Sequence, residues 1–447
     1  MEYESIIIGG GISGLSTAFA LKKRNKNFLL IEKNAYVGGV IQSENINGFQ
    51  IEKGANTVLI RNMESLEMFH ELGLLKKLIL PNQSAKTRYI YKNHKLIALP
   101  TSILSTFFHP ITPLHQLIAW AFKDYFSKPI TNDFTVYEFF TQRFGQAFYE
   151  DLVFPMVSGI FAGEPEVMSF QYNFPKLFEF VQKQGSILKG LKSVEKPSIS
   201  SELKQYWNKM FTFEGGLATL IYHLESCLSK NILKNCEIFK IYPKKNVWAV
   251  SSKNEEFISQ NIVISTPAYH VAQLVKELDP KFSEILMNIN YHPLMVIHFK
   301  FSKANWKKPL DGFGFLKSKN QESFILGCIF NSRIFSHVAP EGFELITVMV
   351  GGATQKHLLN LEIPHLISKV KNQLQQVLEL HYEPEYLSHH YWEKAIPEYT
   401  MNYHSLEKYI LNFQNKYPNV HFLSNFWGGI GVPDCIQKGI RLGKAIN

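Results

Sequence analysis

Three glycines near the start of the chain could bring its backbone against a diphosphate. Gly9, Gly11 and Gly14 in IIIGGGISGL fit the spacing G-x-G-x-x-G. The first glycine allows a tight turn, the second a close approach to the phosphates, and the third lets the next helix pack on the strand. Glu32 ends the following strand, near the expected offset of about 20 residues. Its carboxylate would accept hydrogen bonds from ribose hydroxyls, although a surface carboxylate at a strand end is the alternative.

A second glycine pair favours FAD over NAD as the dinucleotide. Gly38 and Gly39 follow Glu32 closely, in NAYVGGVIQS. They provide a second close backbone approach, which a fold that binds nicotinamide alone does not require. The sequence contains one dinucleotide pattern, so we expect no second site for NADPH.

The glycine run near the C-terminus predicts a site for the flavin ring. In NFWGGIGVPDCIQKGIRLGKAI a helix is expected to begin near Pro433, a residue type suited to the first helical turn. The N-terminus of a helix carries partial positive charge, and reduced flavin is negative around N1 and O2. A loop that merely turns the chain is the alternative.

These glycine-rich turns need strands and helices to position them. Residues 4–9 and 28–32 read as strands and 14–24 as a helix, which together form a βαβ unit. Residues 101–205 are helical and aromatic in character, and their Ser- and Lys-rich end, 185–205, reads as a loop. Strands return in CEIFKIYP and QNIVISTPA and dominate 291–350. The expected fold class is mixed α/β.

Composition narrows the class of protein. The 447 residues are 45% hydrophobic and 19% charged, typical of a globular chain with two or three subdomains. A net charge of +9 suits an anionic partner, but no basic stripe interleaved with aromatics accompanies it, so we expect no nucleic-acid binding. The four cysteines have neither disulfide-framework nor metal-site spacing, and a reducing compartment is expected. We predict no metal site, leader peptide or membrane span.

With its two ends read as one cofactor site, the chain resembles the flavin-containing amine oxidase superfamily, and within it the porphyrinogen-oxidising branch. The resemblance covers nearly the whole length. It rests on VSGIFAGEPEVMSFQYNFPKLFE (157–179), FEGGLATL (213–220), PLDGFGFL (309–316), ITVMVGG (346–352), AIPEY (395–399) and GGIGVPDCI (428–436).

The resemblance implies a Rossmann-type FAD-binding domain, a mixed β-sheet substrate domain and an α-helical membrane-binding subdomain. The positions implied for FAD are Gly9, Gly11, Ile12, Ser13, Gly14, Glu32, Lys33, Gly38, Gly39, Val40, Gly54 and Ala55, with Ile238 beside the adenine and Gly431, Val432 and Pro433 beside the isoalloxazine. Two places depart from the usual pattern of the family. Ala55 and Asn56 stand where proline and arginine or aspartate are frequent, and Asn402 and Tyr403 stand where Gly-His is frequent.

The implied substrate positions are Arg88, Gly159, Phe313, Leu316 and Met349. A porphyrinogen is a broad apolar macrocycle with propionates, so it needs an apolar slot and a cation at the rim, the role of Arg88. Residue pattern alone also allows a surface arginine, a helix-end glycine at 159, and ordinary core positions for the remaining three.

The implied activity is removal of hydride equivalents from protoporphyrinogen IX to FAD, six electrons in all, with oxygen as acceptor and peroxide as product, in haem biosynthesis. Coproporphyrinogen III is the alternative substrate, and we assign no catalytic base. Two further functions stay open: an amine oxidase or carotenoid-type desaturase, and a non-catalytic, FAD-stabilised membrane or assembly protein.

The expected domains are discontinuous. Residues 1–87, 210–277 and 410–447 would bind FAD, 88–100 and 278–409 the substrate, and 101–205 would form the helical membrane-associated subdomain. The segment 99–126, which overlaps the start of this subdomain, is apolar but broken by Pro and His, so it could rest on a bilayer with Trp120 at the interface. A buried helical core is the alternative. We expect a cytoplasmic protein peripherally associated with the inner face of the membrane, with a homodimer among the assemblies it could form.

Overall fold

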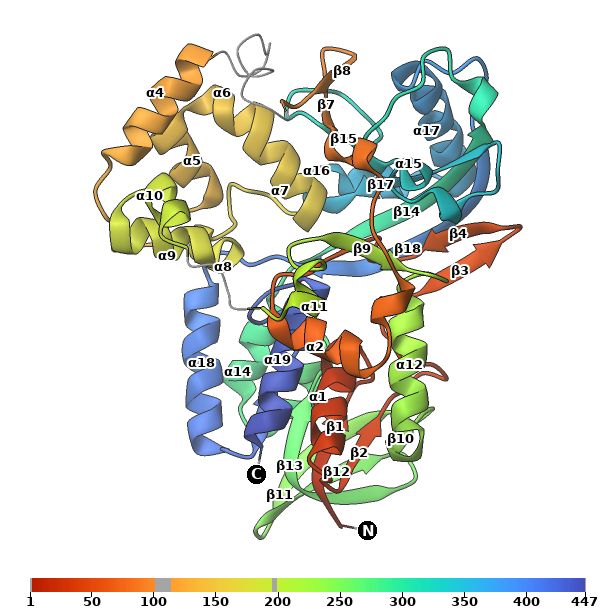
Figure 1. Cartoon of the computed structure of the whole chain (residues 1–447). Coiled ribbons are helices and arrows are strands. Elements are labelled where there is room, and N and C mark those ends of the chain that lie inside the picture. Colours follow the sequence, from red (N-terminus) through yellow and green to blue (C-terminus); the bar gives the residue numbers. More distant parts are fainter. Residues whose placement is uncertain (1, 101–113, 195–198, 447) are drawn as a thin grey trace.

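The computed structural model describes residues 2–100, 114–194 and 199–446. Figure 1 shows three groups of elements: a sheet with helices on both faces at the bottom, a second sheet at the upper right, and a cluster of helices at the upper left. Among the helices of the described part, none is both long enough and apolar enough to cross a bilayer.

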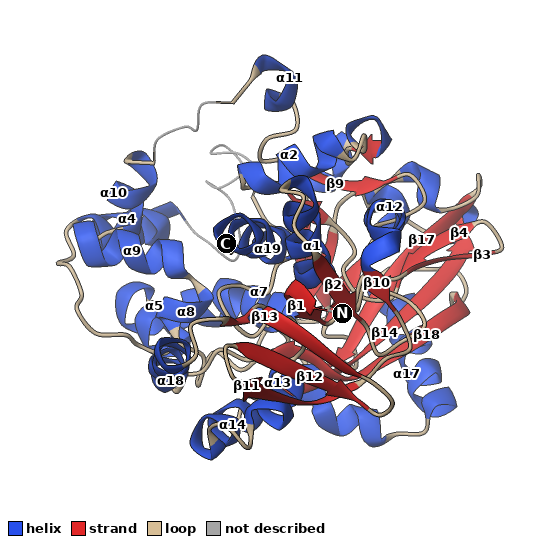
Figure 2. Cartoon of the chain, turned by 90° about the horizontal axis from the view of Figure 1, so that it is seen from below, coloured by secondary structure: helices blue, strands red, loops and turns tan. Residues whose placement is uncertain are grey.

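The first sheet has the order β10-β2-β1-β13-β12-β11, and β19 pairs with β13 beyond the end of β12. Strands β10, β2, β1, β13 and β19 are parallel, whereas β12 and β11 are antiparallel additions. Figure 2 shows β11, β12 and β13 from below. The strands are β1 (Glu2–Ile8), β2 (Phe28–Ile31), β10 (Ile232–Leu233), β11 (Ile238–Lys244), β12 (Val247–Ser252), β13 (Glu256–Ile264) and β19 (Val420–Phe422).

Helices cover both faces of this sheet. Alternate residues of its strands point in opposite directions, and the apolar residues of both sets need to be buried. Ile7 and Leu30 pack with helices on one face, and Ile6 and Leu29 with helices on the other. The first face carries α1 (Ile12–Lys23), α2 (Met63–Glu71), α12 (Ala218–Leu228) and α19 (Val432–Ala445). The second carries α13 (Ala268–Val275), α14 (Pro280–Met287) and α18 (Tyr403–Lys416). The βαβ opening and the helix near Pro433 are confirmed.

The second sheet has the order β18-β14-β17-β16-β15-β7-β8, antiparallel except for the β15–β7 pair. Helix α17 (Ile363–Val377) packs Leu366, Val370 and Leu374 on one face of it. The strands are β7 (Arg88–Lys92), β8 (Lys95–Ala98), β14 (Tyr291–Ser302), β15 (Gly314–Lys317), β16 (Gly327–Ile329), β17 (Phe343–Gly351) and β18 (Glu385–Pro397), with the short helices α15 (Asn331–Ile334) and α16 (Gly352–Gln355) between them. The expected mixed α/β class is confirmed.

Smaller elements join these parts. Two short sheets consist of β3 (Ser43–Ile46) with β4 (Phe49–Glu52), and of β9 (Met210–Phe213) between β5 (Val58–Leu59) and β6 (Leu78–Ile79). Short 3-10 turns lie at Leu75–Lys77, Gln83–Lys86, Ser229–Asn231, Lys303–Asn305, Ser336–Val338 and Lys356–Asn360.

The helical cluster has an aromatic core of its own, in which Phe139 stacks on Phe170 at 3.8 Å. It consists of α4 (Leu114–Tyr125), α5 (Val136–Phe144), α6 (Gln146–Phe148), a π-helical turn at Tyr149–Val153, α7 (Phe154–Phe161), α8 (Phe170–Asn173), α9 (Pro175–Gln184) and α10 (Ile187–Lys192). Residues 101–113 of the predicted subdomain lie outside the described residues.

The prediction of a loop over 185–205 is wrong, because this stretch contains α10 and α11 (Ser201–Lys204). The Ser186 side chain accepts a hydrogen bond from the Lys189 amide and so caps the start of α10. Asp124, a buried residue of α4, accepts further hydrogen bonds from the Ile187 and Leu188 amides. These partners satisfy the amides at the start of α10 that have no partner within the helix. The Ser- and Lys-rich composition had indicated a solvated loop instead.

The predicted domain boundaries stay a proposal, and the contacts of α18 and α14 bear on where they lie. Helix α18 crosses 409/410 without a break, and its residues Tyr403 and Leu406 pack into the core beneath the first sheet. Helix α14 packs there too, through Phe282 and Leu286. We propose that the FAD-binding part includes both helices.

Candidate functional site

The parallel strands of the first sheet bring four loops to one edge. Register pairs Ile8 with Ile31 and with Ile264, and Ile264 with Phe422. The residues that follow these strand ends therefore meet at the carboxyl edge, where open parallel sheets bind their ligands. They include the first glycine turn, Glu32, Ser265 and the chain that leads to the C-terminal glycines.

The first glycine turn is tightly built. Gly9 has φ of +107°, a conformation that favours glycine, and its amide donates to the Ile31 carbonyl at 2.8 Å. A Cβ at Gly14 would lie 2.1 Å from the Gly9 carbonyl oxygen and 2.6 Å from the Ser265 hydroxyl. Only a glycine at position 14 therefore lets α1 pack this closely against the end of β1. Ser265, which sequence analysis missed, donates to the Gly9 carbonyl at 2.7 Å.

Gly11 differs from its neighbours because the space beside it is open. A Cβ there would meet no protein atom within 4 Å, and the extended backbone, with φ of −70°, would accept any residue. Gly11 lines a cavity of about 710 Å³, together with Gly9, Glu32, Lys33, Gly39, Val40 and Ile238. An open space at the N-terminus of α1 is what a diphosphate requires, and this fits the predicted dinucleotide.

Glu32 is held in place by the chain itself. Its side chain is 7% exposed, and one oxygen, Oε2, accepts from the Gly10 amide at 2.7 Å. The other oxygen, Oε1, accepts from the amide and the side chain of Asn34 at 2.9 and 2.8 Å. A carboxylate offers about four acceptor positions, so Oε2 keeps one for a ligand hydroxyl. The ribose role of Glu32 stays a prediction, for which this acceptor position is available.

The second glycine pair lies against the first. The Gly38 amide donates to the Gly10 carbonyl at 2.7 Å, and a Cβ at Gly39 would lie 3.5 Å from the Cα of Gly11. Val40 follows, 45% exposed although apolar, at the wall of the cavity. A Cβ at Gly54 would lie 2.3 Å from the Val40 carbonyl oxygen, and Ala55 packs against the core under α1. These residues from four segments are together as predicted.

The C-terminal helix lies beside the first helix (Figure 1). A Cβ at Gly439 would lie 2.6 Å from the Ser13 carbonyl oxygen, and one at Gly443 would lie 2.7 Å from the Cβ of Ala20. Both glycines of α19 therefore let it approach α1 closely. The contacts advance in the same direction along both helices, so Ile12 and Val432 begin parallel helices. The ends of the chain converge, and Gly431, Val432 and Pro433 reach the same region as Gly9 to Gly14.

Two residues that sequence analysis missed hold the C-terminal glycine turn. The Lys438 ammonium donates to the carbonyls of Ser424, Trp427 and Gly429, the first at 2.8 Å and the last at 3.2 Å. The Tyr399 hydroxyl accepts from the Gly429 amide at 3.1 Å and donates to the Asn425 carbonyl. Tyr399 belongs to the stretch AIPEY, which carried the family resemblance without a role attached.

The predicted substrate residues share one face of the second sheet. Register aligns Leu316 with Gly327 and Gly327 with Met349, across three strands. A Cβ at Gly159 of α7 would lie 2.3 Å from Leu316 Cδ2, so α7 packs directly on this row. Arg88 pairs in register with Gly314 and therefore points to the same face.

Arg88 is exposed, and its guanidinium lies 5.1 Å from the Phe313 ring centroid. Its Nη1 lies 3.4 Å from the Lys86 carbonyl, and no carboxylate of the described residues pairs with it. Arg88 thus leaves a cation free at the edge of an apolar row.

Glu52 and His298 are two buried titratable residues, and the His298 ring contacts the backbone carbonyl of Glu52. Glu52 is 5% exposed and accepts from the Ser43 hydroxyl at 2.6 Å and the Leu217 amide at 2.8 Å. Burial raises the pKa of Glu52 to about 8. His298 is fully buried beside the Glu52 carbonyl at 3.1 Å, and burial lowers its pKa to about 4, so the ring is neutral.

Groups of ligand-forming side chains that could hold a metal ion are absent from the described residues. Near the glycine turns, no described side chain is arranged as a nucleophile with its base. The arrangement can bind a dinucleotide along two helix starts and present an apolar surface with one cation.

Comparisons with known proteins agree with this geometry. Residues 12–447 match the family described as flavin containing amine oxidoreductase. Protoporphyrinogen oxidase 2 of Arabidopsis thaliana is 30% identical, over 97% of this chain and 92% of its own. Coproporphyrinogen III oxidase of Bacillus subtilis is 27% identical, over 97% and 96%. A crystal structure from Exiguobacterium sp. 255-15, provisionally assigned as a protoporphyrinogen oxidase, superposes with a TM-score of 0.82 at 21% identity, over 99% and 98%.

Proposed function

The chain belongs to the flavin-containing amine oxidoreductase family, and we propose that it oxidises the porphyrinogen protoporphyrinogen IX to protoporphyrin IX. Family membership makes the chain an oxidoreductase with FAD as its cofactor. When bound, FAD supplies the acceptor for the hydride equivalents that leave the substrate. The residues of the chain then have to bind FAD, orient the substrate and exclude water.

The binding roles follow from the contacts at the strand edge. The amides at the start of α1 would receive the diphosphate beside Gly11, where a side chain would otherwise stand. Glu32 would accept a ribose hydroxyl at its remaining acceptor position. The start of α19 would stabilise negative charge on the ring, with its loop held rigid by Lys438 and Tyr399.

The row formed by Leu316, Gly327 and Met349, with Arg88 at its edge, is the observation that carries the substrate proposal. A broad, apolar macrocycle suits a row of side chains on a sheet face. Arginine suits a propionate because its planar fork matches a carboxylate. Amine oxidase activity is less suited, since a free guanidinium would repel a protonated amine.

Coproporphyrinogen III is the second candidate substrate, because a relative named for that substrate matches this chain over nearly its full length. The two candidates differ in their number of propionates. A single unpaired arginine at the row favours the less carboxylated protoporphyrinogen IX. Oxygen is the proposed acceptor, with peroxide as product.

The deciding experiment gives the FAD-loaded enzyme each porphyrinogen in air, after anaerobic preparation. We expect porphyrin fluorescence to grow with protoporphyrinogen IX, and more slowly with coproporphyrinogen III. Faster oxidation of coproporphyrinogen III would reverse the substrate assignment. No growth above the enzyme-free rate with either compound, while FAD stays bound, would remove the proposal.

Arg88→Gln tests the substrate position separately from the cofactor. We expect KM to rise about tenfold or more, the value of a charged hydrogen bond, with unchanged FAD content. Lys95→Gln, at an exposed position on the neighbouring strand β8, is the matched control and should leave KM unchanged. Identical KM values for wild type and Arg88→Gln would show that the arginine is a surface residue.

We also propose that the outer face of α4 rests on a membrane. Ile118, Phe122 and Phe126 recur at helical spacing and are 60%, 65% and 66% exposed. Trp120, the interfacial residue predicted from sequence, instead contacts Phe148 with ring centroids 4.7 Å apart. An amphipathic helix with such a face lies in the interface plane.

Co-sedimentation with anionic vesicles tests the membrane proposal. The double variant Phe122→Ser and Phe126→Ser should lose most of the bound fraction while keeping its FAD content. Tyr382→Ser removes an aromatic residue that is 77% exposed elsewhere and should bind as wild type does. Equal sedimentation of all three proteins would refute the contact.

A further inference from the structure

A buried glutamate lies where the helical cluster, the second sheet and the C-terminal glycine turn meet. Glu398 directly follows β18 and is 3% exposed. Its carboxylate contacts the helical cluster and the second sheet, and its neighbour Tyr399 holds the glycine turn. A carboxylate leaves water only at a cost that its partners have to offset. The partners of Glu398 therefore indicate its role.

Each oxygen of the Glu398 carboxylate has its own partner. Oε1 accepts from the Glu164 amide at 2.7 Å, and Oε2 lies 3.0 Å from Nε2 of His292 on β14. The fit is close, because a Cβ at Gly163 would lie 3.0 Å from Oε1. Hydrogen bonds from amides to carboxylates are shorter and stronger than those to neutral acceptors. Glu398 thus fastens the chain that follows α7 to β14 and β18.

A second contact fixes the end of α7 from the side of β17. Ala162 follows the last residue of α7, and its carbonyl accepts from the Ala353 amide of α16 at 2.7 Å. A Cβ at Gly352 would lie 2.9 Å from the same carbonyl oxygen. Figure 1 shows the end of α7 beside α16, which directly follows β17. The end of α7 is therefore held between the ends of β17 and β18, and in this pair of contacts Glu398 provides the side chain.

These two contacts set the distance between α7 and the substrate row. Gly159 lies three residues before Ala162, about one helical turn. It faces Leu316 so closely that a Cβ would lie 2.3 Å from Leu316 Cδ2. Because a helix keeps its shape, a shift of its end would carry Gly159 away from the row. A misplacement of about 1 Å can lower the rate of a reaction about a hundredfold.

We propose that Glu398 is a positioning residue for the porphyrinogen, a role that rests on the proposed function. It acts through α7, which it holds at a fixed distance from the substrate row. Tyr399, the next residue, holds the turn beside which the flavin ring is expected. The two neighbours therefore relate the substrate side of the site to its cofactor side.

The fold has other contacts at this place, which makes the role testable. The segment after Glu398 pairs with the chain before α8. The Ser169 amide donates to the Tyr399 carbonyl at 2.9 Å, and Thr400 forms a bridge with Met168. These backbone contacts do not depend on the side chain at 398. We therefore expect Glu398→Ala to fold and to bind FAD.

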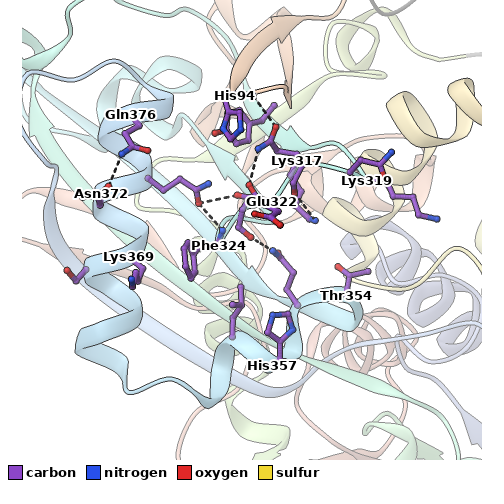
Figure 3. Close-up of a pocket in the computed structure, with 18 of the residues that line it drawn as sticks. His94, Lys317, Lys319, Glu322, Phe324, Thr354, His357, Lys369, Asn372 and Gln376 are labelled. Carbon is purple, nitrogen blue, oxygen red and sulfur yellow. Dashed lines mark hydrogen bonds between the residues drawn. The ribbon is translucent and has the colours of Figure 1, made fainter.

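The kcat of the FAD-loaded enzyme with protoporphyrinogen IX separates positioning from stability. Glu398→Ala should lower kcat at least about tenfold at unchanged FAD content, because a bound but misplaced substrate reacts slowly. Glu398→Gln keeps the shape and an acceptor for the Glu164 amide, so it should restore most of the wild-type kcat. Figure 3 shows the matched control, Glu322, an exposed acid that lines another pocket, of about 980 Å³. Glu322→Ala should leave kcat unchanged.

The outcomes distinguish this role from the proposed function. A wild type that oxidises neither porphyrinogen would remove the proposed function, and the positioning role with it. An active wild type with the same kcat in Glu398→Ala would overturn the positioning role alone. A lower melting temperature of Glu398→Ala at unchanged kcat would likewise overturn it, since the contact would then serve stability only.

Hydrogen exchange, followed by mass spectrometry, tests the anchor without a substrate. Pro165 has no amide hydrogen, so a peptide that ends there reports on the Glu164 amide and the residues before it. Exchange at 162–164 should be faster in Glu398→Ala than in wild type, and close to wild type in Glu398→Gln. Equal exchange in all three proteins would show that Glu398 does not hold the end of α7 and would overturn the proposal.

Discussion

Replacement of Glu52 by glutamine should make the protein more stable at alkaline pH. Glu52 lies at the end of β4, where its carboxyl group meets Ser43 and the Leu217 amide at the start of α12. Glutamine retains the shape and one acceptor for Leu217, and its amide can donate to the Ser43 hydroxyl. The variant therefore removes the ionisation of a buried acid and little else.

The size of the effect follows from the pKa of Glu52. Folding raises it from 4.5 to about 8, so the folded state binds the proton more tightly than the unfolded chain. The favourable contribution is complete below 4.5 and is lost as the pH rises towards 8. At about 1.4 kcal/mol per pH unit, the loss between pH 5 and pH 9 is about 4 kcal/mol. With an unfolding entropy of about 2.1 cal/mol/K per residue, this corresponds to about 4 °C.

Melting temperatures of the FAD-loaded wild type and Glu52→Gln between pH 5 and pH 9 measure the effect. The variant should gain on wild type by about 4 °C across this range, with the change concentrated below pH 8. Glu256→Gln is the control, because hydrogen bonds with Lys244 and Tyr242 lower the pKa of this exposed acid. Parallel curves for wild type and Glu52→Gln would show that Glu52 is ionised in the folded protein and would refute the reasoning.

Four further predictions concern the cofactor site. Gly11→Val should fold with an unchanged melting temperature as apoprotein but retain no FAD, because its side chain would enter the open space; FAD retention in this variant would place the cofactor elsewhere. Gly14→Ala should instead lower the melting temperature of the apoprotein, as its Cβ would overlap the Gly9 carbonyl, and an unchanged value would contradict the packing. Gly439→Ala should cost about 1–3 kcal/mol by separating α19 from α1, measured by urea unfolding, whereas no loss would mean that the helices are not in contact. Lys438→Met should release FAD about tenfold more readily on dialysis, followed by flavin absorbance, and equal retention would show that its three carbonyl contacts do not hold the turn.

Sequence reasoning succeeded where the contacts that determine the structure join residues close together in the sequence. The apolar run of β1, the glycine spacing and Glu32 all act within one βαβ unit, so their types and offsets specify the turn. It was less informative where contacts join distant segments. Lys438 received no interpretation from the sequence, and Tyr399 appeared only within the matched stretch AIPEY, without a role. Both are explained by a loop that only the folded sheet brings to them.

The burial of Glu52 was missed for a related reason. Glu52 alternates with apolar residues in a short hairpin, a pattern that indicates an exposed side chain. Its burial depends on the turn before α12, some 165 residues later, where the Leu217 amide meets its carboxylate. Lys317 likewise ends β15 and is buried among residues that read as core.

The stagger of the two helices supports the proposal that both ends of the chain serve one cofactor. Gly439 contacts α1 near Ser13 and Ser16, and Gly443 contacts it near Thr17 and Ala20. Aligning the contacts places Val432 about four residues beyond the level of Ile12, roughly 6 Å at about 1.5 Å per residue. The N-termini of α1 and α19, both with partial positive charge, therefore lie at different levels along their shared axis direction. One helix could serve only one of the two negative regions of FAD, the diphosphate or the reduced ring. In the proposed arrangement, the parallel helix α19, which follows β19 at the same sheet edge, would supply the second without a further domain.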